Sequence, residues 1–170
     1  GGIPIIRPLK QCLAANEFCE IYGILNGTSN YILTQMREDG KPFAEALKDA
    51  QSKGYAENDP TADIEGYDTA RKISILSWVA FGKLIEIEKI GRKGIGGITA
   101  EDIEKAKAAN CAIKLIGRAK LIDGEVRCTV APELIPSSDP LAIVEGVYNA
   151  IVVRGNFIGE AMFYGEGAGG

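Results

Sequence analysis

Residues 50–72, with the sequence AQSKGYAENDPTADIEGYDTARK, are the stretch around which the rest of the chain must be arranged. Acidic side chains stand at positions 57, 59, 63, 65 and 68, directly before the basic residues at 71 and 72. Pro60 fixes its own φ and biases Asp59 towards an extended backbone, so no helix can run through residues 57–60. The stretch therefore predicts an acidic loop followed by a helix.

Downstream of Pro60, apolar residues recur at helical spacing, which predicts one helix from about residue 61 to residue 81. Asp68 and Lys72 lie four positions apart on this helix and so share one of its faces. Two interpretations are open. An exposed ion pair and acids near a helix start need no function, because the helix dipole favours acids there. Alternatively, the acids line a polar pocket in which Lys72 handles a proton.

The second half of the same helix, residues 73–81 (ISILSWVAF), is apolar on nearly every side. Such a helix belongs in a protein core, and Trp78 is expected to be buried with it. The pair formed by Asp68 and Lys72 would then lie where the helix passes from wetter to drier surroundings. This position favours a partly buried pair with a function.

The composition excludes several classes of function. A net charge of −4 without a basic cluster argues against nucleic-acid binding, and no apolar run reaches membrane-spanning length. The chain has no histidine, which excludes histidine-activated nucleophiles and HExxH metal sites. The cysteines have no CxxC spacing and are expected to be small core residues in a reducing compartment: Cys12, Cys19, Cys111 and Cys128.

The rest of the chain predicts a mixture of helices and antiparallel strands. Further helices are expected over residues 30–38, 42–53 and 100–109, the last with Thr99 as its N-cap. Strands are expected over residues 18–25, 112–121, 125–135, 150–154 and 158–164, with an Asp-Gly hairpin turn at 123–124. We interpret the glycine-rich stretch 91–97 as a plain connector. The fold class is therefore α+β, a mixed, antiparallel-rich sheet packed against helices in one domain over residues 1–170.

Several motifs in this chain resemble the homoserine dehydrogenase family. Residues 50–72 match the pattern AxxxGxxxxxPxxDIxGxDxxxK. Further matches are GGIPII at 1–6, NGTSNYIL at 26–33, ITAEDIEKA at 98–106, IKLIG at 113–117, NAIVV at 149–153 and FYGEGAGG at 163–170. Because the matches follow in the right order over essentially the whole chain, the resemblance is specific. It covers the substrate-binding catalytic domain of that family.

The resemblance implies a reversible, NAD(P)-dependent reduction of L-aspartate 4-semialdehyde to L-homoserine, on the route to threonine, methionine and isoleucine. In the family, a Rossmann domain that binds NADP or NAD precedes this domain, and residues 1–170 lack it. The isolated fragment is therefore expected to be inactive. The resemblance further implies a homodimer in the cytoplasm, with no nucleic-acid or membrane partner.

The resemblance also implies roles for individual residues. Lys72 matches the proton donor to the aldehyde oxygen, and Asp68 matches an acid that helps to hold both the substrate and the lysine. Positions that match the substrate-binding site are Glu57 for the substrate ammonium group, Asp63, and the turn at Gly27 and Thr28. The chemistry is physically reasonable, because a lysine ammonium both stabilises and protonates an oxygen on which negative charge builds.

Cofactor and cation positions follow from the same resemblance. Gly167 and Gly169 match the terminal glycines that close on the nicotinamide nucleotide. Gly1 and Ile3 match two backbone ligands of a monovalent cation, whose other ligands would lie upstream.

Two other classes of function compete with this interpretation. The first is a non-enzymatic amino-acid-binding or oligomerisation domain, which would bind homoserine without any dependence of turnover on Lys72. The second is a hydrolase in which Glu57 and an aspartate flank a glycosidic bond. The chain disfavours the hydrolase, because carbohydrate sites usually need aromatic platforms and Trp78 is the single tryptophan.

Overall fold

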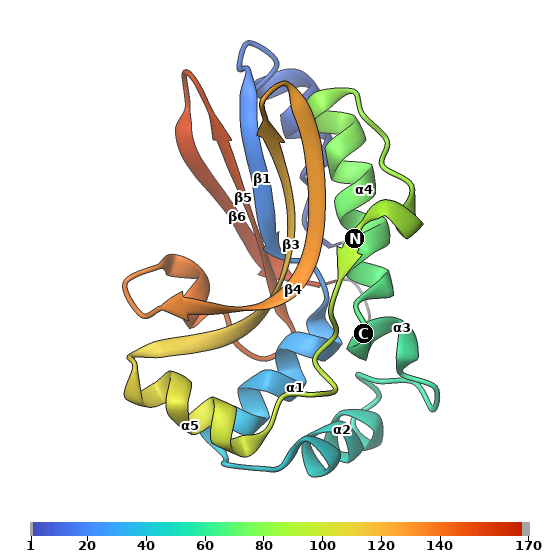
Figure 1. Ribbon diagram of the computed structural model, residues 1–170, viewed down its shortest axis with the longest axis vertical. Helices are drawn as coiled ribbons and strands as arrows, with labels where there is room; N and C mark the ends of the chain where they lie inside the picture. The colour runs from blue at the N-terminus through green and yellow to red at the C-terminus, as the bar shows by residue number, and fades with distance from the viewer. Residues whose placement is uncertain (1, 168–170) are drawn as a thin grey trace.

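A computed structural model describes residues 2–167 of the chain (Figure 1). Its centre is a six-stranded sheet in the order β2-β4-β3-β1-β5-β6. Neighbouring strands are antiparallel, apart from the short parallel pair of β2 and β4. The strands are β1 (Phe18–Ile24), β2 (Gly91–Arg92), β3 (Cys111–Ile122), β4 (Glu125–Pro136), β5 (Tyr148–Gly155) and β6 (Gly159–Glu166). The predicted α+β class with an antiparallel-rich sheet is confirmed.

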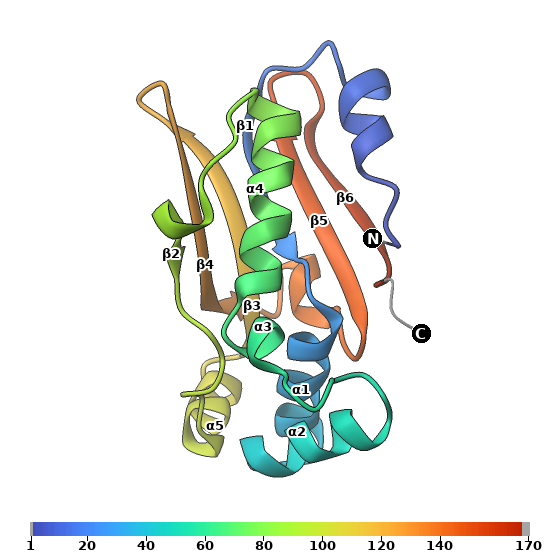
Figure 2. The same cartoon turned by 90° about the vertical axis from the view of Figure 1, so that its right-hand side faces the viewer.

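The α-helices lie on one face of the sheet and at one of its ends. Figure 2 shows α4 running along that face, with α1, α2 and α5 gathered at the end. The α-helices are α1 (Gly27–Glu38), α2 (Phe43–Ser52), α3 (Thr61–Ile64), α4 (Tyr67–Phe81) and α5 (Ala100–Ala108). Three shorter helical segments are η1 (Pro8–Cys12), η2 (Ile87–Lys89) and η3 (Pro140–Ile143).

The predicted single helix over residues 61–81 is wrong, because the chain turns between α3 and α4. Gly66 adopts the left-handed conformation, with φ of 77°, which only glycine adopts without strain. Helical periodicity continues on both sides of this turn, so the apolar pattern alone did not reveal it. The break sets Asp63 on α3 and Asp68 on α4.

Local sequence signals predicted the turns and helix starts described next correctly. The hairpin of β3 and β4 pairs Ile122 with Glu125 around Asp123 and Gly124, both at positive φ, as the Asp-Gly signal predicts. Thr99 is the N-cap of α5, as predicted, and it forms a capping box with Asp102. These signals succeeded because each depends on a few neighbouring residues and not on the tertiary context.

The core lies mainly between α4 and the inner face of the sheet. Gly117 of β3 permits close packing there, because a Cβ at that position would stand 2.8 Å from Thr69 and 2.9 Å from Leu25. The outer side of α4 is not covered, contrary to expectation. Ile75 is 49% exposed and Trp78 is 54% exposed, although the ammonium of Lys10 in η1 lies 5.5 Å from the centroid of the Trp78 ring.

The cysteine prediction is also partly wrong. Cys128 is buried, but Cys12 and Cys19 are exposed and Cys111 is half-buried. Cys12 lies at the end of η1 and Cys19 near the start of β1, so neither stands in the middle of a helix or strand that packs on the core.

A buried lysine marks the outer face of the sheet. Lys114 of β3 is only 2% exposed, and its ammonium donates to the carbonyl of Val144 and, at 3.3 Å, to Oδ1 of Asn30. Burial lowers its pKa from 10.5 to about 8, and the charge of Glu145 opposes this effect. Lys114 therefore ties the segment after η3 to α1 and β3.

The lowered pKa of Lys114 predicts how stability depends on pH. Between pH 8 and pH 10.5 the unfolded chain keeps a proton that the folded state has lost, so the free energy of unfolding rises with pH, by at most about 3 kcal/mol from this group. Below pH 8 both states hold the proton and the gain is absent. Urea unfolding should show that the free energy of unfolding increases more between pH 7.5 and pH 10 in the wild type than in Lys114→Met. Equal gains would contradict the assignment.

Candidate active site

Asn26 joins two acids that lie far from it in the sequence. Its Oδ1 accepts from the backbone N–H of Ser29, which caps α1 and makes this helix begin at Gly27 instead of at residue 30. Its Nδ2 donates to Asp63 at 2.7 Å and to Asp68 at 2.9 Å. One asparagine therefore sets both the start of α1 and the positions of two carboxylates.

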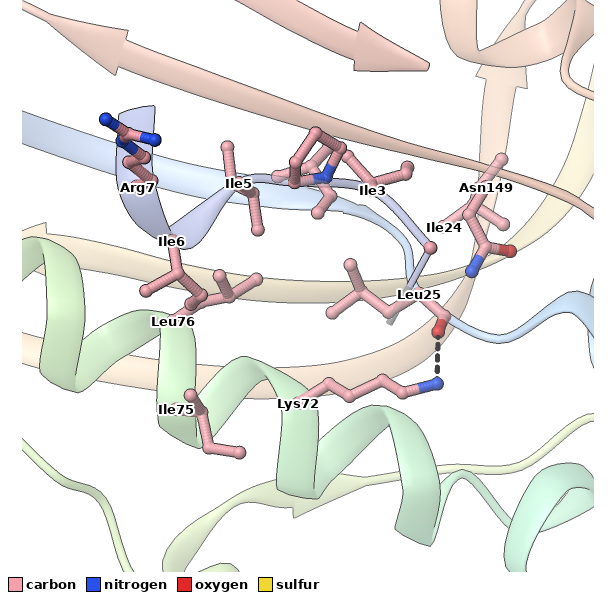
Figure 3. A pocket seen from close by; sticks show the side chains of 13 residues that line it. Ile3, Ile5, Ile6, Arg7, Ile24, Leu25, Lys72, Ile75, Leu76 and Asn149 are labelled. Carbon is pink, nitrogen blue, oxygen red and sulfur yellow. Dashed lines mark hydrogen bonds between the residues drawn. The ribbon is translucent and has the colours of Figure 1, made fainter. Parts of the chain in front are cut away.

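Lys72 is held by two acceptors. Its Nζ donates to Oδ2 of Asp68 at 2.6 Å. It also donates to the carbonyl oxygen of Leu25 at 2.9 Å, the bond drawn in Figure 3. The side chains of Lys72 and Asp68 are 41% and 28% exposed, so the pair is neither fully buried nor fully solvated. The ammonium thus has a fixed direction and stays accessible to a small molecule.

The electrostatics of this cluster centre on Asp63. Burial raises the pKa of Asp63 above its ordinary value, and the negative charges of Asp68 and Glu57 act in the same direction. The hydrogen bond from Asn26 and the charge of Lys72 oppose this rise. A cationic ligand group would relieve the crowding of negative charge.

The acids and Lys72 line a polar cavity of about 210 Å³. Its wall comes from the ends of β1 and β5, the start of α1, the acidic loop, α3, α4 and the segment after β6. The lining residues are Asn26, Gly27, Thr28, Tyr55, Asp63, Asp68, Lys72, Val147, Asn149 and Gly167. A cavity with two carboxylates and one ammonium suits a small zwitterion.

A larger apolar chamber of about 560 Å³ adjoins the polar cavity. Its walls are residues 2–7, the end of β1, α4 and β5, and aliphatic side chains such as Ile3, Leu25 and Ile151 cover them. Lys72 and Asn149 line both spaces. Figure 3 shows these two side chains at the same end of the chamber. The polar groups shared by the two spaces therefore lie at their junction.

Glu57 lies in an exposed loop beside the cavity and is not among its lining residues. Two side chains hold this loop through its backbone. Gln51 Nε2 donates to the carbonyl of Glu57 at 3.1 Å, and the hydroxyl of Thr28 donates to the carbonyl of Tyr55. The loop is thus fixed, and its carboxylate is close enough to influence the pKa of Asp63.

The glycine-rich stretch 91–97 is more than a connector, contrary to expectation, because it clamps the turn between α3 and α4. The backbone N–H of Ile95 donates to the carbonyl of Ile64 at 2.7 Å, and Arg92 donates to the carbonyl of Glu65 at 2.6 Å. A Cβ at Gly94 would stand 2.3 Å from the Ile64 carbonyl oxygen. This contact holds the turn on which the positions of Asp63 and Asp68 depend.

Most of the site residues expected from the sequence lie together around the polar cavity. They are Gly27, Thr28, Asp63, Asp68, Lys72 and Gly167. Ile3 lines the apolar chamber instead. Gly1 and Gly169 lie outside the described residues.

The sequence reasoning missed Asn26 and Asn149. The Asn-Gly pair that opens α1 carried a signal for Asn26 as a cap, but not for its bonds to the two acids. Nothing local marks Asn149, which reaches the site only through the pairing of β5 with β1.

Neither a metal cluster nor a membrane span is found among the described residues. In the part of the chain that the structure describes, no group of three or more Cys, Asp or Glu side chains is placed to hold a metal ion. Within residues 2–167, no helix is long and apolar enough to cross a membrane. The monovalent cation expected through backbone carbonyls stays a prediction.

A family model for homoserine dehydrogenase matches residues 4–170 of the chain. The chain belongs to the homoserine dehydrogenase family. It is 44% identical over 169 residues to homoserine dehydrogenase from Bacillus subtilis, covering 99% of this chain and 39% of the relative. It is 46% identical over 175 residues to the enzyme from Mycobacterium tuberculosis H37Rv, covering 100% of this chain and 40% of the relative. The chain thus spans about 40% of the length of these curated relatives.

Solved structures agree with the family assignment. A homoserine dehydrogenase from Thiobacillus denitrificans has a TM-score of 0.96 at 46% identity, over 99% of this chain and 39% of the other. A hyperthermophilic archaeal homoserine dehydrogenase mutant in complex with NADPH has a TM-score of 0.81 at 35% identity, over 100% of this chain and 48% of the other. The homoserine dehydrogenase fold is therefore shown for this chain.

Proposed function

We propose that residues 1–170 form the substrate-binding and catalytic domain of an enzyme that reversibly reduces L-aspartate 4-semialdehyde to L-homoserine. The observation that carries the proposal is the placement of Lys72. Its ammonium, held by Asp68 and the carbonyl of Leu25, lies where an acid-lined cavity meets an apolar chamber. A substrate whose ammonium lies among the acids would direct its aldehyde towards this lysine.

The chemistry of each group follows from this arrangement. Asp63, together with Glu57 from the loop, binds the substrate ammonium, because carboxylates are its natural partners. As the carbonyl carbon accepts a hydride, the electron pair of the C=O bond moves onto oxygen, and Lys72 stabilises that charge and donates a proton to give the alcohol. Asp68 holds the ammonium of Lys72 in position through its hydrogen bond. In the reverse direction neutral Lys72 accepts the hydroxyl proton.

The apolar chamber fits a nicotinamide nucleotide. Aliphatic side chains form a dry wall beside the junction, and Gly167 lies on the other side of the junction, in the wall of the polar cavity. A Cβ at Gly167 would stand 3.0 Å from Nδ2 of Asn149, so only glycine leaves the backbone this close to the wall. Ile3, Leu25, Ile151 and Gly167 would contact the nicotinamide, which supplies the hydride when bound. The archaeal relative was solved in complex with NADPH, and we extend nicotinamide use to this chain on that basis.

The alternative is a domain that binds an amino acid or assembles without catalysis. The acid-lined cavity would serve such a domain equally well. The anchored Lys72 beside an apolar chamber favours catalysis, because ligand binding alone does not require an ammonium at that junction.

The test is an assay of the full-length protein that contains residues 1–170. We expect NADP- or NAD-dependent oxidation of L-homoserine, measured by the absorbance of the reduced cofactor. The isolated fragment should bind homoserine weakly in calorimetry, yet catalyse no oxidation. Tight NADP binding by the fragment alone would show that our division between domains is wrong.

The loop position of Glu57 gives a prediction about affinity. Glu57→Gln removes a negative charge near the proposed ammonium site but leaves Lys72 and Asp68 in place. In the full-length enzyme we expect the KM for homoserine to rise about tenfold with little change in kcat, as for a lost binding contact. Asp59→Asn, in the same exposed loop, is the control and should change neither constant. A fall in kcat alone would contradict the binding role.

The outer face of the sheet supports a homodimer. Helices α1 to α5 do not cover this face, and among residues 2–167 only the segment with η3 packs on it. Tyr164 is 56% exposed there and stacks on Tyr148, with ring centroids 5.2 Å apart. We propose that a second copy of the chain covers residues 149–164. Light scattering at micromolar concentration should give a dimer mass, and Tyr164→Glu should give the monomer. A monomeric wild type would refute the proposal.

A further inference from the structure

Asn149, near the start of β5, has a side chain that the fold itself does not use. The residue is only 9% exposed. Its Oδ1 is buried and has no hydrogen-bond partner within residues 2–167. Buried polar atoms almost always have partners in proteins, so the unpaired Oδ1 shows that no hydrogen bond through this oxygen commits the amide to the fold. A role for the side chain therefore lies with its nitrogen, which faces the cavities. The same side chain lines both the polar cavity and the apolar chamber.

We propose that Asn149 is a second hydrogen-bond donor to the reacting oxygen of the substrate, opposite Lys72. This inference rests on the proposed function, because it concerns the same site. In Figure 3 the nitrogen of the Asn149 amide points towards the end of the chamber where Lys72 meets the carbonyl of Leu25. Two donors, one charged and one neutral, thus face the same small space.

The amide has little freedom to turn away from this space. The backbone of Asn149 is fixed because it pairs with Gly165 in the hairpin of β5 and β6. Gly167 lies against the amide so closely that a Cβ there would stand 3.0 Å from Nδ2 and 3.3 Å from Cγ. Among the described residues, the Asn149 side chain is therefore held by packing and not by hydrogen bonds. A donor held in advance can stabilise charge at the moment of reaction without reorganising.

The two donors would divide the work during aldehyde reduction. Negative charge develops on the carbonyl oxygen, and both Lys72 and Asn149 donate to it. Only Lys72 can then transfer a proton, because an amide N–H is far too weak an acid. Asn149 keeps its proton and stabilises the charge through a hydrogen bond. It is therefore a catalytic residue by contact with the reacting atom, and not a second acid.

The kinetic test compares two substitutions in the full-length enzyme. Asn149→Asp keeps the shape of the side chain, removes the donor and adds a negative charge, so we expect kcat to fall by about 10²-fold or more. For Asn149→Ala, we expect kcat to fall by about tenfold to 10²-fold. Tyr148→Phe, the neighbour that faces the outer side of the sheet, should match the wild type. If Asn149→Asp keeps near-normal kcat while Asn149→Ala loses it, the side chain only fills space and the inference is wrong.

A binding test without cofactor separates this inference from the proposed function. Calorimetry compares L-homoserine with L-2-aminobutyrate, which lacks the hydroxyl group. If Asn149 contacts that oxygen, the preference of the wild type for homoserine should shrink about fivefold in Asn149→Ala, as expected for one lost hydrogen bond. An unchanged preference overturns the inference. If the wild type oxidises no homoserine at all, the proposed function fails first.

Discussion

Replacing Lys72 by methionine is expected to lower kcat of the full-length enzyme for homoserine oxidation by at least ~10²-fold, with little change in homoserine affinity. Methionine keeps the aliphatic stem that lines the apolar chamber but has no group that can take or give a proton. The ammonium is also the donor that Asp68 and the Leu25 carbonyl hold at the junction. Its loss removes both proton transfer and charge stabilisation.

The chain offers a matched control for this substitution. Lys105 pairs with Glu101 at 2.7 Å with the same i,i+4 spacing, but these side chains are 70% and 76% exposed. Exposed pairs contribute little to stability, so Lys105→Met should leave both turnover and the unfolding midpoint near those of the wild type. Near-normal turnover in Lys72→Met would contradict the assignment, whereas equal losses in both variants would indicate a general effect of removing positive charge.

The sequence could predict those parts of the site that depend on local spacing. Asp68 and Lys72 had to share a helix face because four residues separate them, and the structure joins them at 2.6 Å. The Asp-Gly hairpin and the capping box at Thr99 followed from the same kind of short-range rule. The resemblance to a known family added which acids belong to the site, since spacing alone left the pair open as an ordinary exposed one.

The parts that could not be predicted depend on contacts between distant segments. The turn at Gly66 interrupts a periodic apolar pattern because the stretch 91–97 packs against it, and no local signal reveals that contact. Asn26 bonds to acids 37 and 42 positions away. The exposed side of α4 at Ile75 and Trp78 was mistaken for core, because an apolar sequence does not show which faces a neighbouring element covers.

Gly94→Ala is expected to damage the site from a distance. The added Cβ would stand 2.3 Å from the Ile64 carbonyl oxygen and 2.6 Å from the Cα of Glu65, and both are backbone atoms that cannot rotate away. The turn between α3 and α4 must therefore shift, and Asp63 and Asp68 shift with its two ends. We expect a loss of about 1–3 kcal/mol in the free energy of unfolding, as for other overpacked sites.

The effect of Gly94→Ala on activity should exceed its effect on stability. A displacement of about 1 Å in groups that position a substrate can cost about 10²-fold in rate, so kcat/KM should fall by that order under conditions where the variant is still fully folded. Gly97→Ala is the control, because a Cβ there meets nothing within 4 Å. Urea unfolding and kinetics of both variants, measured together, decide the question. The clash of the added Cβ is with backbone atoms, so side-chain rotation cannot relieve it and the turn must move. If Gly94→Ala nevertheless keeps its activity, the contact of residues 91–97 with this turn does not position Asp63 and Asp68 for catalysis.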